Sequence, residues 1–272
     1  PFEMSEELLL PFAYVFAGLL GAILGSFYYA TATRVSYFFY SAARKSYPRK
    51  RDRFRALIFK PSFCMECGAP ISRVYLIPVF GYAFSRARCA ECGTRISPKH
   101  LVAEIYLAIL LPTLLYFGRS WPEALLMTLF AGQLYVSIVT DTRHMILDHE
   151  NTAFLFLWAA ILTAIADGTT ARLIGGGGTL VIFGALYWIS RLTGRTMMGF
   201  GDVPLSAAVG LFFGFPTLLI VFVAAACGSI FYSLVIQGSR NAPAPFGASL
   251  GFATLTAIPL QIVAQWAGFL QF

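Results

Sequence analysis

The sequence predicts an all-α polytopic membrane protein with about eight transmembrane helices and a small hydrophilic domain inserted after the first helix. Three observations predict this class. Hydrophobic residues make up 58% of the 272 positions and charged residues only 12%, whereas soluble domains carry about 25% charged residues. The mean hydropathy is +0.71. Long apolar runs recur along most of the chain, and most of the charged residues gather in one segment between them.

Eight segments approach the length of about 20 apolar residues that crosses a bilayer. The N-terminal flank of the first segment is acidic and its apolar run is too long for a cleavable signal peptide, so we expect this helix to remain. The fourth and sixth segments are short, which predicts that they are tilted or partly buried against their neighbours. The expected spans are 8–30, 101–118, 123–140, 152–167, 173–190, 203–215, 217–236 and 248–268.

Basic residues concentrate between the first two expected helices. Of the 20 Lys and Arg residues, 14 lie between Arg34 and Lys99, where only Asp52, Glu66 and Glu91 oppose them. Cytoplasmic loops of membrane proteins carry an excess of Lys and Arg, so we expect this segment in the cytoplasm and the N-terminus outside. The charge sits in a membrane-flanked segment and not on the face of a soluble domain, so we expect no nucleic-acid partner.

Alternation of the spans assigns the later loops to the same two sides of the membrane. Counted from an outside N-terminus, the loops that carry Arg143, Arg191, Arg195 and Arg240 fall on the side of the basic segment. The positive-inside rule is therefore satisfied. The predicted division is a first membrane helix (1–32), a basic cytoplasmic domain (33–100) and a membrane bundle (101–272).

Four cysteines of the basic domain form two C-x-x-C pairs. Each pair can place two thiolates on one tetrahedral zinc ion, and Gly68 and Gly93, which follow the pairs, permit the tight turn. Two disulfides are the alternative, but they need an oxidising compartment. A cytoplasmic domain favours a structural Zn²⁺ ion, which would offset the small core of this segment. The predicted ligands are Cys64, Cys67, Cys89 and Cys92.

Two aspartates stand at the edges of apolar segments. A carboxylate is costly next to hydrocarbon and is therefore a functional candidate. Asp141 ends the third span and Asp202 begins the sixth, so alternation puts both at the cytoplasmic boundary. Two carboxyl groups within hydrogen-bonding reach cannot both ionise near neutral pH, and one can act as general base for a water while the other acts as general acid. A helix cap or a hydrated boundary residue is the alternative for either acid alone.

Residues beside the two aspartates are further candidates. Gly199 and Gly201 precede Asp202 in a G-x-G-D element, where glycine allows close backbone approach and unusual dihedral angles. His144 follows Asp141 by three residues. It can orient that carboxylate or be a polar surface residue. A catalytic pair with supporting loop residues is therefore the sharper hypothesis.

The remaining charged and glycine-rich features have both functional and structural interpretations. Asp148 and Glu150 can attract a basic substrate segment, or they can simply be hydrated boundary residues. His100 and His149 are interpreted as solvated boundary residues. The run Gly175–Gly178 lacks the lysine and the strand of a nucleotide-binding loop, so close helix packing is the better explanation.

This ordered set of motifs resembles the bacterial type IV prepilin leader peptidases, which are GxGD-type intramembrane aspartyl proteases. The resemblance rests on the D-x-x-H element at 141–144 and the G-x-G-D element at 199–202, behind a loop with two C-x-x-C pairs. It spans nearly the whole chain. Further matching pieces are Gly25-Ser26-Phe27, Arg34, Ile77-Pro78, Tyr82, Glu104 and Pro243-Ala244-Pro245-Phe246-Gly247.

The resemblance implies a multi-pass enzyme of the bacterial inner membrane, in contact with lipid. Such enzymes remove the basic leader of prepilins or pseudopilins at the cytoplasmic face, after a glycine and usually before a phenylalanine. Asp141 and Asp202 match the catalytic aspartates, and the four cysteines match the zinc ligands. Many members then methylate the new N-terminus with S-adenosylmethionine, a step to which Glu104 would be linked. A glycine-rich cofactor loop of the soluble type is not visible in the sequence.

Three positions depart from the family pattern. Leu147-Asp148-His149 replaces Leu-Pro-Asp, Pro204 replaces a lysine, and Tyr29 replaces an asparagine. A divergent substrate or a catalytically altered relative is one alternative that follows. A non-enzymatic membrane scaffold or transporter with a cytoplasmic zinc knuckle is the other. Transporter charges usually lie near the midplane on inverted repeats, whereas both acids here lie at one edge.

Overall fold

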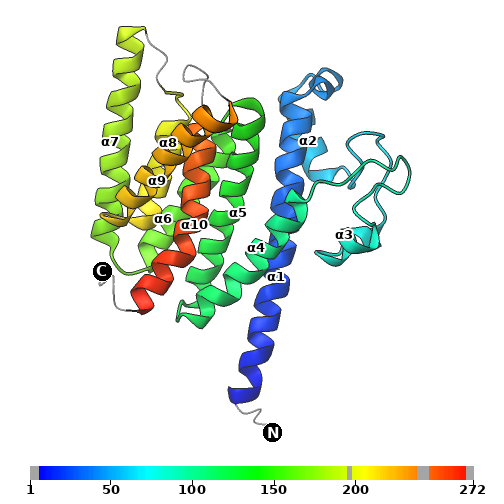
Figure 1. The fold of residues 1–272 in the computed structure, drawn as a ribbon, viewed down its shortest axis with the longest axis horizontal. Coiled ribbons are helices and arrows are strands. Elements are labelled where there is room, and N and C mark those ends of the chain that lie inside the picture. The colour runs from blue at the N-terminus through cyan, green and yellow to red at the C-terminus, as the bar shows by residue number, and fades with distance from the viewer. Residues whose placement is uncertain (1–5, 195–197, 238–244, 268–272) are drawn as a thin grey trace. The chain divides into compact units, whose positions relative to one another are not determined.

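The computed structural model describes residues 6–194, 198–237 and 245–267, with side chains from residue 10 onward. The described chain is almost entirely helical (Figure 1), as the composition predicts. Some residues used in the sequence analysis lie outside the described residues. The side of the membrane expected for two of the loop arginines and the role of the first residues of the Pro-Ala-Pro-Phe-Gly motif therefore stay predictions. These residues are Arg195, Arg240, Pro243 and Ala244.

All eight apolar segments predicted from the sequence form helices. Over the described residues, six helical spans are long and apolar enough to cross a membrane. The fourth and sixth segments form two shorter apolar helices of 17 and 12 residues, as their short apolar runs predict. The eight helices are α1 (Glu6–Val35), α4 (Lys99–Tyr116), α5 (Trp121–His144), α6 (His149–Ile165), α7 (Thr169–Thr193), α8 (Asp202–Phe213), α9 (Thr217–Phe231) and α10 (Phe246–Trp266).

The chain divides into two compact units, Pro1–Leu115 and Tyr116–Phe272. In the first unit, α1 continues into a π-helical segment, η1 (Ser36–Tyr40). The rest of the basic segment is built of short elements. These elements are η2 (Ala42–Ser46), α2 (Lys50–Phe59), η3 (Arg73–Leu76) and α3 (Phe80–Phe84).

Two glycines of α1 let it approach α4 closely within the first unit. A Cβ atom at Gly25 would lie 2.6 Å from the carbonyl oxygen of Ala103, and one at Gly21 would overlap the backbone of Leu107. Backbones pack this closely in membrane helices only where side chains are small. The contact brings Ser26 beside the first turn of α4.

In the second unit, α8 is the central helix. It packs against α6, α7, α9 and α10, and nine of its twelve residues are buried. A Cβ atom at Gly210 would lie 2.6 Å from the carbonyl oxygen of Gly175, so α7 and α8 meet backbone to backbone. The packing role predicted for the glycine run is confirmed at Gly175 and Gly176, whereas Gly177 and Gly178 face open space. This packing holds the helix that Asp202 begins.

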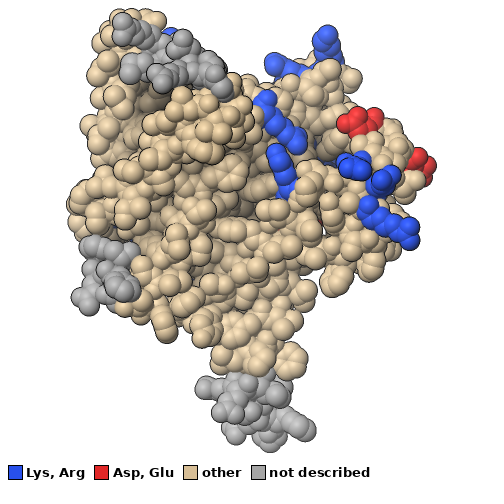
Figure 2. All heavy atoms as spheres, in the orientation of Figure 1, with Lys and Arg blue, Asp and Glu red and all other residues tan. Residues whose placement is uncertain are grey.

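The surface charge is unevenly distributed. Figure 2 shows the visible Lys and Arg side chains gathered over one region of the molecule, while most of this face carries neither basic nor acidic side chains. Along the chain the basic residues concentrate in the segment from Arg34 to Lys99. Many large apolar side chains of the long helices are exposed, among them Val181, Ile220 and Leu260. An apolar surface of this extent is expected where helices face lipid.

Candidate functional site

Asp141 lies in the last turn of α5, and its side chain is buried in the second unit. The residue is only 6% exposed. Its Oδ2 atom accepts a 2.7 Å hydrogen bond from the backbone N–H of Ala248, in the first turn of α10. Helix α5 ends just beyond it, because Met145 adopts left-handed backbone (φ 53°) and donates its N–H to the carbonyl oxygen of Asp141 at 2.9 Å. The acid is therefore held at the junction of two helices.

Asp202 is the first residue of α8 and is half-buried. Its Oδ2 atom accepts the N–H of Gly199 at 3.1 Å, and its own N–H donates to the carbonyl oxygen of Gly199 at 3.2 Å. The loop before α8 thus folds back on the residue that begins the helix. Pro204 is the third residue of α8, where its missing N–H is tolerated because the first turn has no intrahelical partner for it.

Leu147 packs against two glycines beside the two acids, Gly201 before α8 and Gly247 in the first turn of α10. A Cβ atom at Gly201 would lie 2.8 Å from the Cβ atom of Leu147, and one at Gly247 would lie 2.9 Å from its Cδ1 atom. Gly247 also faces Oδ2 of Asp141, and Gly201 directly precedes Asp202, so the segments that carry the two acids meet at Leu147. The structure therefore brings the two acids together, although 61 residues separate them in sequence.

The glycines of the G-x-G-D element serve close approach. Gly201 has φ −63° and ψ −25°, a conformation that any residue adopts. Gly201 is needed because a side chain there would collide with Leu147. The prediction that it adopts an unusual dihedral angle is wrong. A Cβ atom at Gly199 would lie 3.4 Å from Oδ2 of Asp202, so this glycine leaves room for the carboxylate.

His144, Asp148 and Glu150 lie where α5 ends and α6 begins. His144 is half-buried and interacts electrostatically with Asp148. Asp148 is the residue before the first turn of α6, and Glu150 lies exposed in that turn. Acidic residues at a helix N-terminus are stabilised by the helix dipole. A role toward a substrate leader stays a prediction for both acids.

A buried hydrogen-bond network that the sequence analysis missed joins α5 to α6. Asn151 donates from Nδ2 to Oγ of Ser137 at 2.6 Å and to the carbonyl oxygen of Gln133 at 3.2 Å, and Gln133 donates from Nε2 to Oδ1 of Asn151 at 2.5 Å. Ser137 lies one helical turn before Asp141. The sequence signal for this network was the presence of two amide side chains, Gln133 and Asn151, in apolar segments. A buried amide group needs hydrogen-bond partners.

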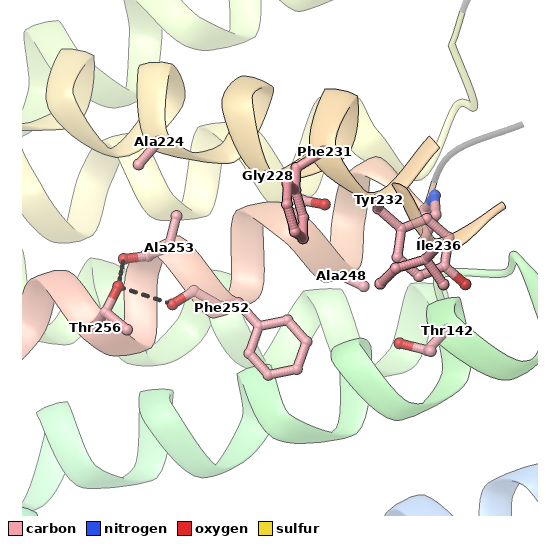
Figure 3. Close-up of a pocket in the computed structure, with 12 residues that line it drawn as sticks. Thr142, Ala224, Gly228, Phe231, Tyr232, Ile236, Ala248, Phe252, Ala253 and Thr256 are labelled. Carbon is pink, nitrogen blue, oxygen red and sulfur yellow. Dashed lines mark hydrogen bonds between the residues drawn. The ribbon is translucent and has the colours of Figure 1, made fainter. Parts of the chain in front are cut away.

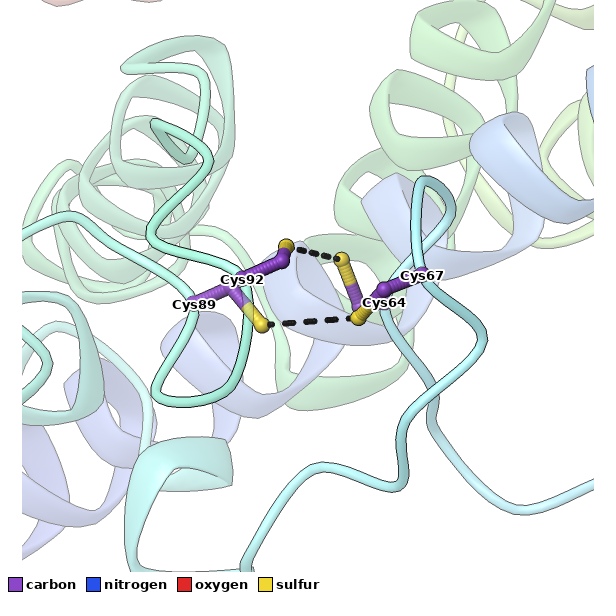
Figure 4. Close-up of side chains that lie close together, drawn as sticks. All are labelled: Cys64, Cys67, Cys89 and Cys92. Atoms are coloured by element: carbon purple, nitrogen blue, oxygen red, sulfur yellow. Dashed lines mark hydrogen bonds between the residues drawn. The ribbon is translucent and has the colours of Figure 1, made fainter.

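The four cysteine thiols of the basic segment converge, as Figure 4 shows. Their Sγ atoms all lie within 4.8 Å of one another. The separations are 3.8 Å between Cys64 and Cys92 and 3.9 Å between Cys67 and Cys89. All four are free thiols, and the cluster could bind a metal ion.

The two knuckles that carry these thiols repeat one backbone pattern. Gly68 donates its N–H to the carbonyl oxygen of Cys64 at 2.9 Å, and Gly93 donates to that of Cys89 at 3.0 Å. Both glycines adopt left-handed backbone, with φ 75° and φ 71°. A residue with a Cβ atom is strained there, so the glycines close the turns as the sequence predicts.

Glu104 lies in a buried polar cluster of the first unit and is 1% exposed. Its Oε2 atom accepts the N–H of Val79 at 2.7 Å, and its Oε1 atom lies 2.8 Å from Nε2 of His100. His100 also lies 3.3 Å from Oγ of Ser26 and packs against the ring of Tyr29. The interpretation of His100 as a solvated boundary residue is therefore wrong. Its spacing of four residues from Glu104 on one helix was the signal.

Glu104 holds a strained turn. Val79 has φ 64° and ψ −53°, and Phe80 donates its N–H to the carbonyl oxygen of Pro78 at 2.7 Å. This is a γ-turn of the strained kind, which is rare for a residue with a branched side chain. The buried carboxylate accepts the N–H of the strained residue itself and so stabilises the turn.

Comparison with known proteins identifies the family. The model of the bacterial peptidase A24 N-terminal domain matches residues 19–117, and that of the type IV leader peptidase family matches residues 127–234. A prepilin leader peptidase/N-methyltransferase of Dichelobacter nodosus is 30% identical over 98% of this chain and 94% of the relative. Proteins of the same name from Neisseria gonorrhoeae and Bacillus subtilis are 27% and 26% identical, over 91% and 88% of this chain and 91% of each relative. No solved structure matches. The match to the first relative covers nearly the whole of both chains, and the chain therefore belongs to the type IV leader peptidase family.

Proposed function

We propose that this chain is a prepilin leader peptidase, a membrane-embedded aspartic endopeptidase that removes the basic leader of prepilins or pseudopilins. The observation that carries the proposal is the approach of Asp141, on α5, to Asp202, on α8, at one end of the second unit. Membership of the family supports the same activity, since the relatives are named for it.

General acid–base chemistry follows from two neighbouring carboxyl groups that share one proton. The ionised carboxylate takes a proton from a water molecule, and the oxygen of that water attacks the scissile carbonyl carbon. The protonated carboxyl group stabilises the oxyanion that develops. The C–N bond then breaks, and the carboxyl group that took the proton from water passes it to the leaving amine. The hydrogen bonds from Ala248 and Gly199 fix the two side chains. This fixed geometry limits the reorganisation that the reaction requires.

The enzyme works in the bacterial inner membrane as a multi-pass protein, with its N-terminus outside and its basic segment in the cytoplasm. Six long apolar helices among the described residues support the membrane assignment. The orientation is supported by the 14 Lys and Arg residues between the first two helices. In this orientation Asp141 and Asp202 face the cytoplasmic boundary, where a basic leader would lie.

The four-cysteine cluster is proposed as a structural Zn²⁺ site. A tetrahedral ion with Zn–S bonds of about 2.3 Å requires sulfur atoms about 3.8 Å apart. The separations of 3.8 Å and 3.9 Å fit this requirement. With four thiolate ligands the ion would have no open position for catalysis, so its contribution would be to hold the two knuckles together.

N-methylation of the new N-terminus is proposed as a second activity, on the names of the relatives. The surroundings of Glu104 do not fit an S-adenosylmethionine site. Its carboxylate is buried, and Val79 and His100 occupy both of its oxygen atoms. We therefore derive no methyl-transfer step from Glu104.

The direct test of the proposed function is cleavage by the full chain reconstituted in lipid vesicles. We expect a purified prepilin to lose its leader at a single peptide bond, as seen by mass spectrometry of both products. A scaffold or transporter would leave the prepilin intact. An intact prepilin after incubation with folded, membrane-inserted protein would therefore reject the peptidase function.

A further inference from the structure

An uncharged groove lies between α9 and α10 (Figure 3). Its volume is ≈ 330 Å³. Its lining comes from α9, from the π-helical segment η4 (Tyr232–Ile236) that follows α9, from α10 with the preceding Pro245, and from Thr142 of α5. Every lining residue is uncharged. Because no lining residue is charged, the groove suits an apolar occupant. Helical segments with π-type hydrogen bonding, such as η4, also occur often at functional sites.

Small residues keep the groove open. Gly228 of α9 faces α10, and a Cβ atom there would lie 3.8 Å from that of Ser249, an ordinary contact with room beyond it. Ala224 and Ala253 line the same groove. Small residues let another helix approach closely in a membrane. Aromatic side chains stand beside this opening, with Phe231 60% and Phe252 57% exposed.

One end of the groove lies beside the candidate catalytic residue Asp141. Figure 3 shows Thr142 and Ala248 toward one end and Thr256 toward the other. Thr142 follows Asp141 directly, and Ala248 both lines the groove and donates its N–H to Asp141 at 2.7 Å. Eight residues separate Ala248 from Thr256 on α10, which corresponds to about 12 Å at the helical rise. The groove thus leads away from Asp141 for about two helical turns.

We propose that this groove receives the apolar segment of the prepilin that directly follows the scissile bond. The inference rests on the proposed peptidase function. A substrate cut at Asp141 must lead its membrane-inserted part away from that carboxylate through an apolar path, and the groove begins at Thr142 and Ala248, which neighbour Asp141. Its length takes about two turns of a substrate helix. A lipid acyl chain is the competing occupant, and the experiments below separate the two.

The first experiment fills the groove. Gly228→Leu places a side chain into it, whereas Gly184→Leu on α7 is the matched control, since a Cβ atom at Gly184 has open space around it. We expect Gly228→Leu to raise KM for the full prepilin about tenfold, because it removes substrate binding and leaves the reacting groups unchanged. Cleavage of a short leader peptide that ends a few residues past the scissile bond should stay at the wild-type rate.

Two results would overturn the groove assignment. One is wild-type KM for the full prepilin in Gly228→Leu. The other is equal loss on the full prepilin and the short peptide, which would show that position 228 affects the reacting groups and not the binding of the apolar segment. Wild-type protein that cleaves neither substrate would reject the peptidase function itself, so the two failures are distinguishable.

The second experiment identifies the occupant. A photo-reactive phenylalanine replaces Phe252 in the groove or, as control, Trp188 of α7, which is 66% exposed, both in an Asp202→Asn background that retains substrate. We expect Phe252 to crosslink to the apolar segment of added prepilin and Trp188 not to do so. Crosslinks from Phe252 to lipid alone in the presence of prepilin would assign the groove to lipid and overturn the proposal.

Discussion

The backbone N–H of Ala248 donates a 2.7 Å hydrogen bond to Oδ2 of Asp141, although 107 residues separate the two. Ala248 lies in the first turn of α10, where N–H groups have no partner within the helix. The start of α10 therefore offers a fixed donor to the buried carboxylate. This bond ties α10, the last of the described helices, to the candidate catalytic residue on α5.

Gly247 should be required for this arrangement. A Cβ atom there would lie 3.1 Å from Oδ2 of Asp141 and 2.9 Å from Cδ1 of Leu147, so Gly247→Val must displace one of them. We expect kcat for prepilin cleavage to fall about tenfold to a hundredfold, because small displacements of catalytic groups cost this much. Steady-state cleavage in vesicles measures it. Gly184→Val is the control, and equal activity of the two variants would contradict the account.

Gly201 should be required because of Leu147. A Cβ atom at Gly201 would lie 2.8 Å from that of Leu147, so Gly201→Ala should shift Asp202 and lower the cleavage rate about tenfold. The double variant Gly201→Ala/Leu147→Gly removes the clash, because glycine has no Cβ atom, and we expect it to recover part of the lost activity, as residues in contact are not additive. If the effects of the two substitutions on the cleavage rate are additive in this double-mutant cycle, contact with Leu147 is not the reason that position 201 requires glycine.

Metal content tests the cysteine cluster. We expect about one zinc ion per chain in protein purified without added metal, and loss of that ion in Cys64→Ser/Cys89→Ser. Removal should loosen residues 60–98 more than α5–α10, which hydrogen exchange can measure. Cys227→Ser is the matched control, since Cys227 is exposed on α9 and lies outside the cluster. Equal zinc in all three proteins would refute the site.

Asp148 and Glu150 are predicted to attract a basic leader. Reversal of both to lysine should slow cleavage about threefold to tenfold at low salt and less at high salt, since salt screens exposed charges beyond about 8–10 Å. The neutral variants Asp148→Asn and Glu150→Gln control for the effect of both acids on the start of α6. The measurement is cleavage rate against ionic strength. If the charge-reversed variant cleaves at the wild-type rate at low salt, the two acids do not attract the leader and are hydrated boundary residues.

The sequence predicted those features that local composition determines. Eight apolar runs predicted eight helices, and the short fourth and sixth runs became the short helices α6 and α8. The spacing of the cysteines and their following glycines predicted the convergence of four thiols. Both predictions depend on patterns that span only a few tens of residues, namely apolar runs and the spacing of metal ligands. A single sequence is therefore enough to make them.

Contacts between distant segments could not be predicted in this way. The packing of Leu147 on Gly201 and Gly247, and the bond from Ala248 to Asp141, depend on how four helices meet. The contact of His100 with Ser26, 74 residues away, could not be predicted either, although the spacing of His100 from Glu104 indicated a pair on one helix. Pairing between buried polar groups is decided by tertiary structure, and a sequence shows only that each needs a partner.

The central claim is that Asp141 and Asp202 act together as the acid–base pair that cleaves the prepilin leader. The most direct measurement is the cleavage rate of Asp141→Asn and Asp202→Asn, each reconstituted in vesicles and compared with wild type at equal protein level. Because an amide can neither give nor take the proton, we predict that each variant loses at least about a hundredfold in rate while it remains folded and inserted. Near-wild-type cleavage by either variant would contradict the aspartyl mechanism.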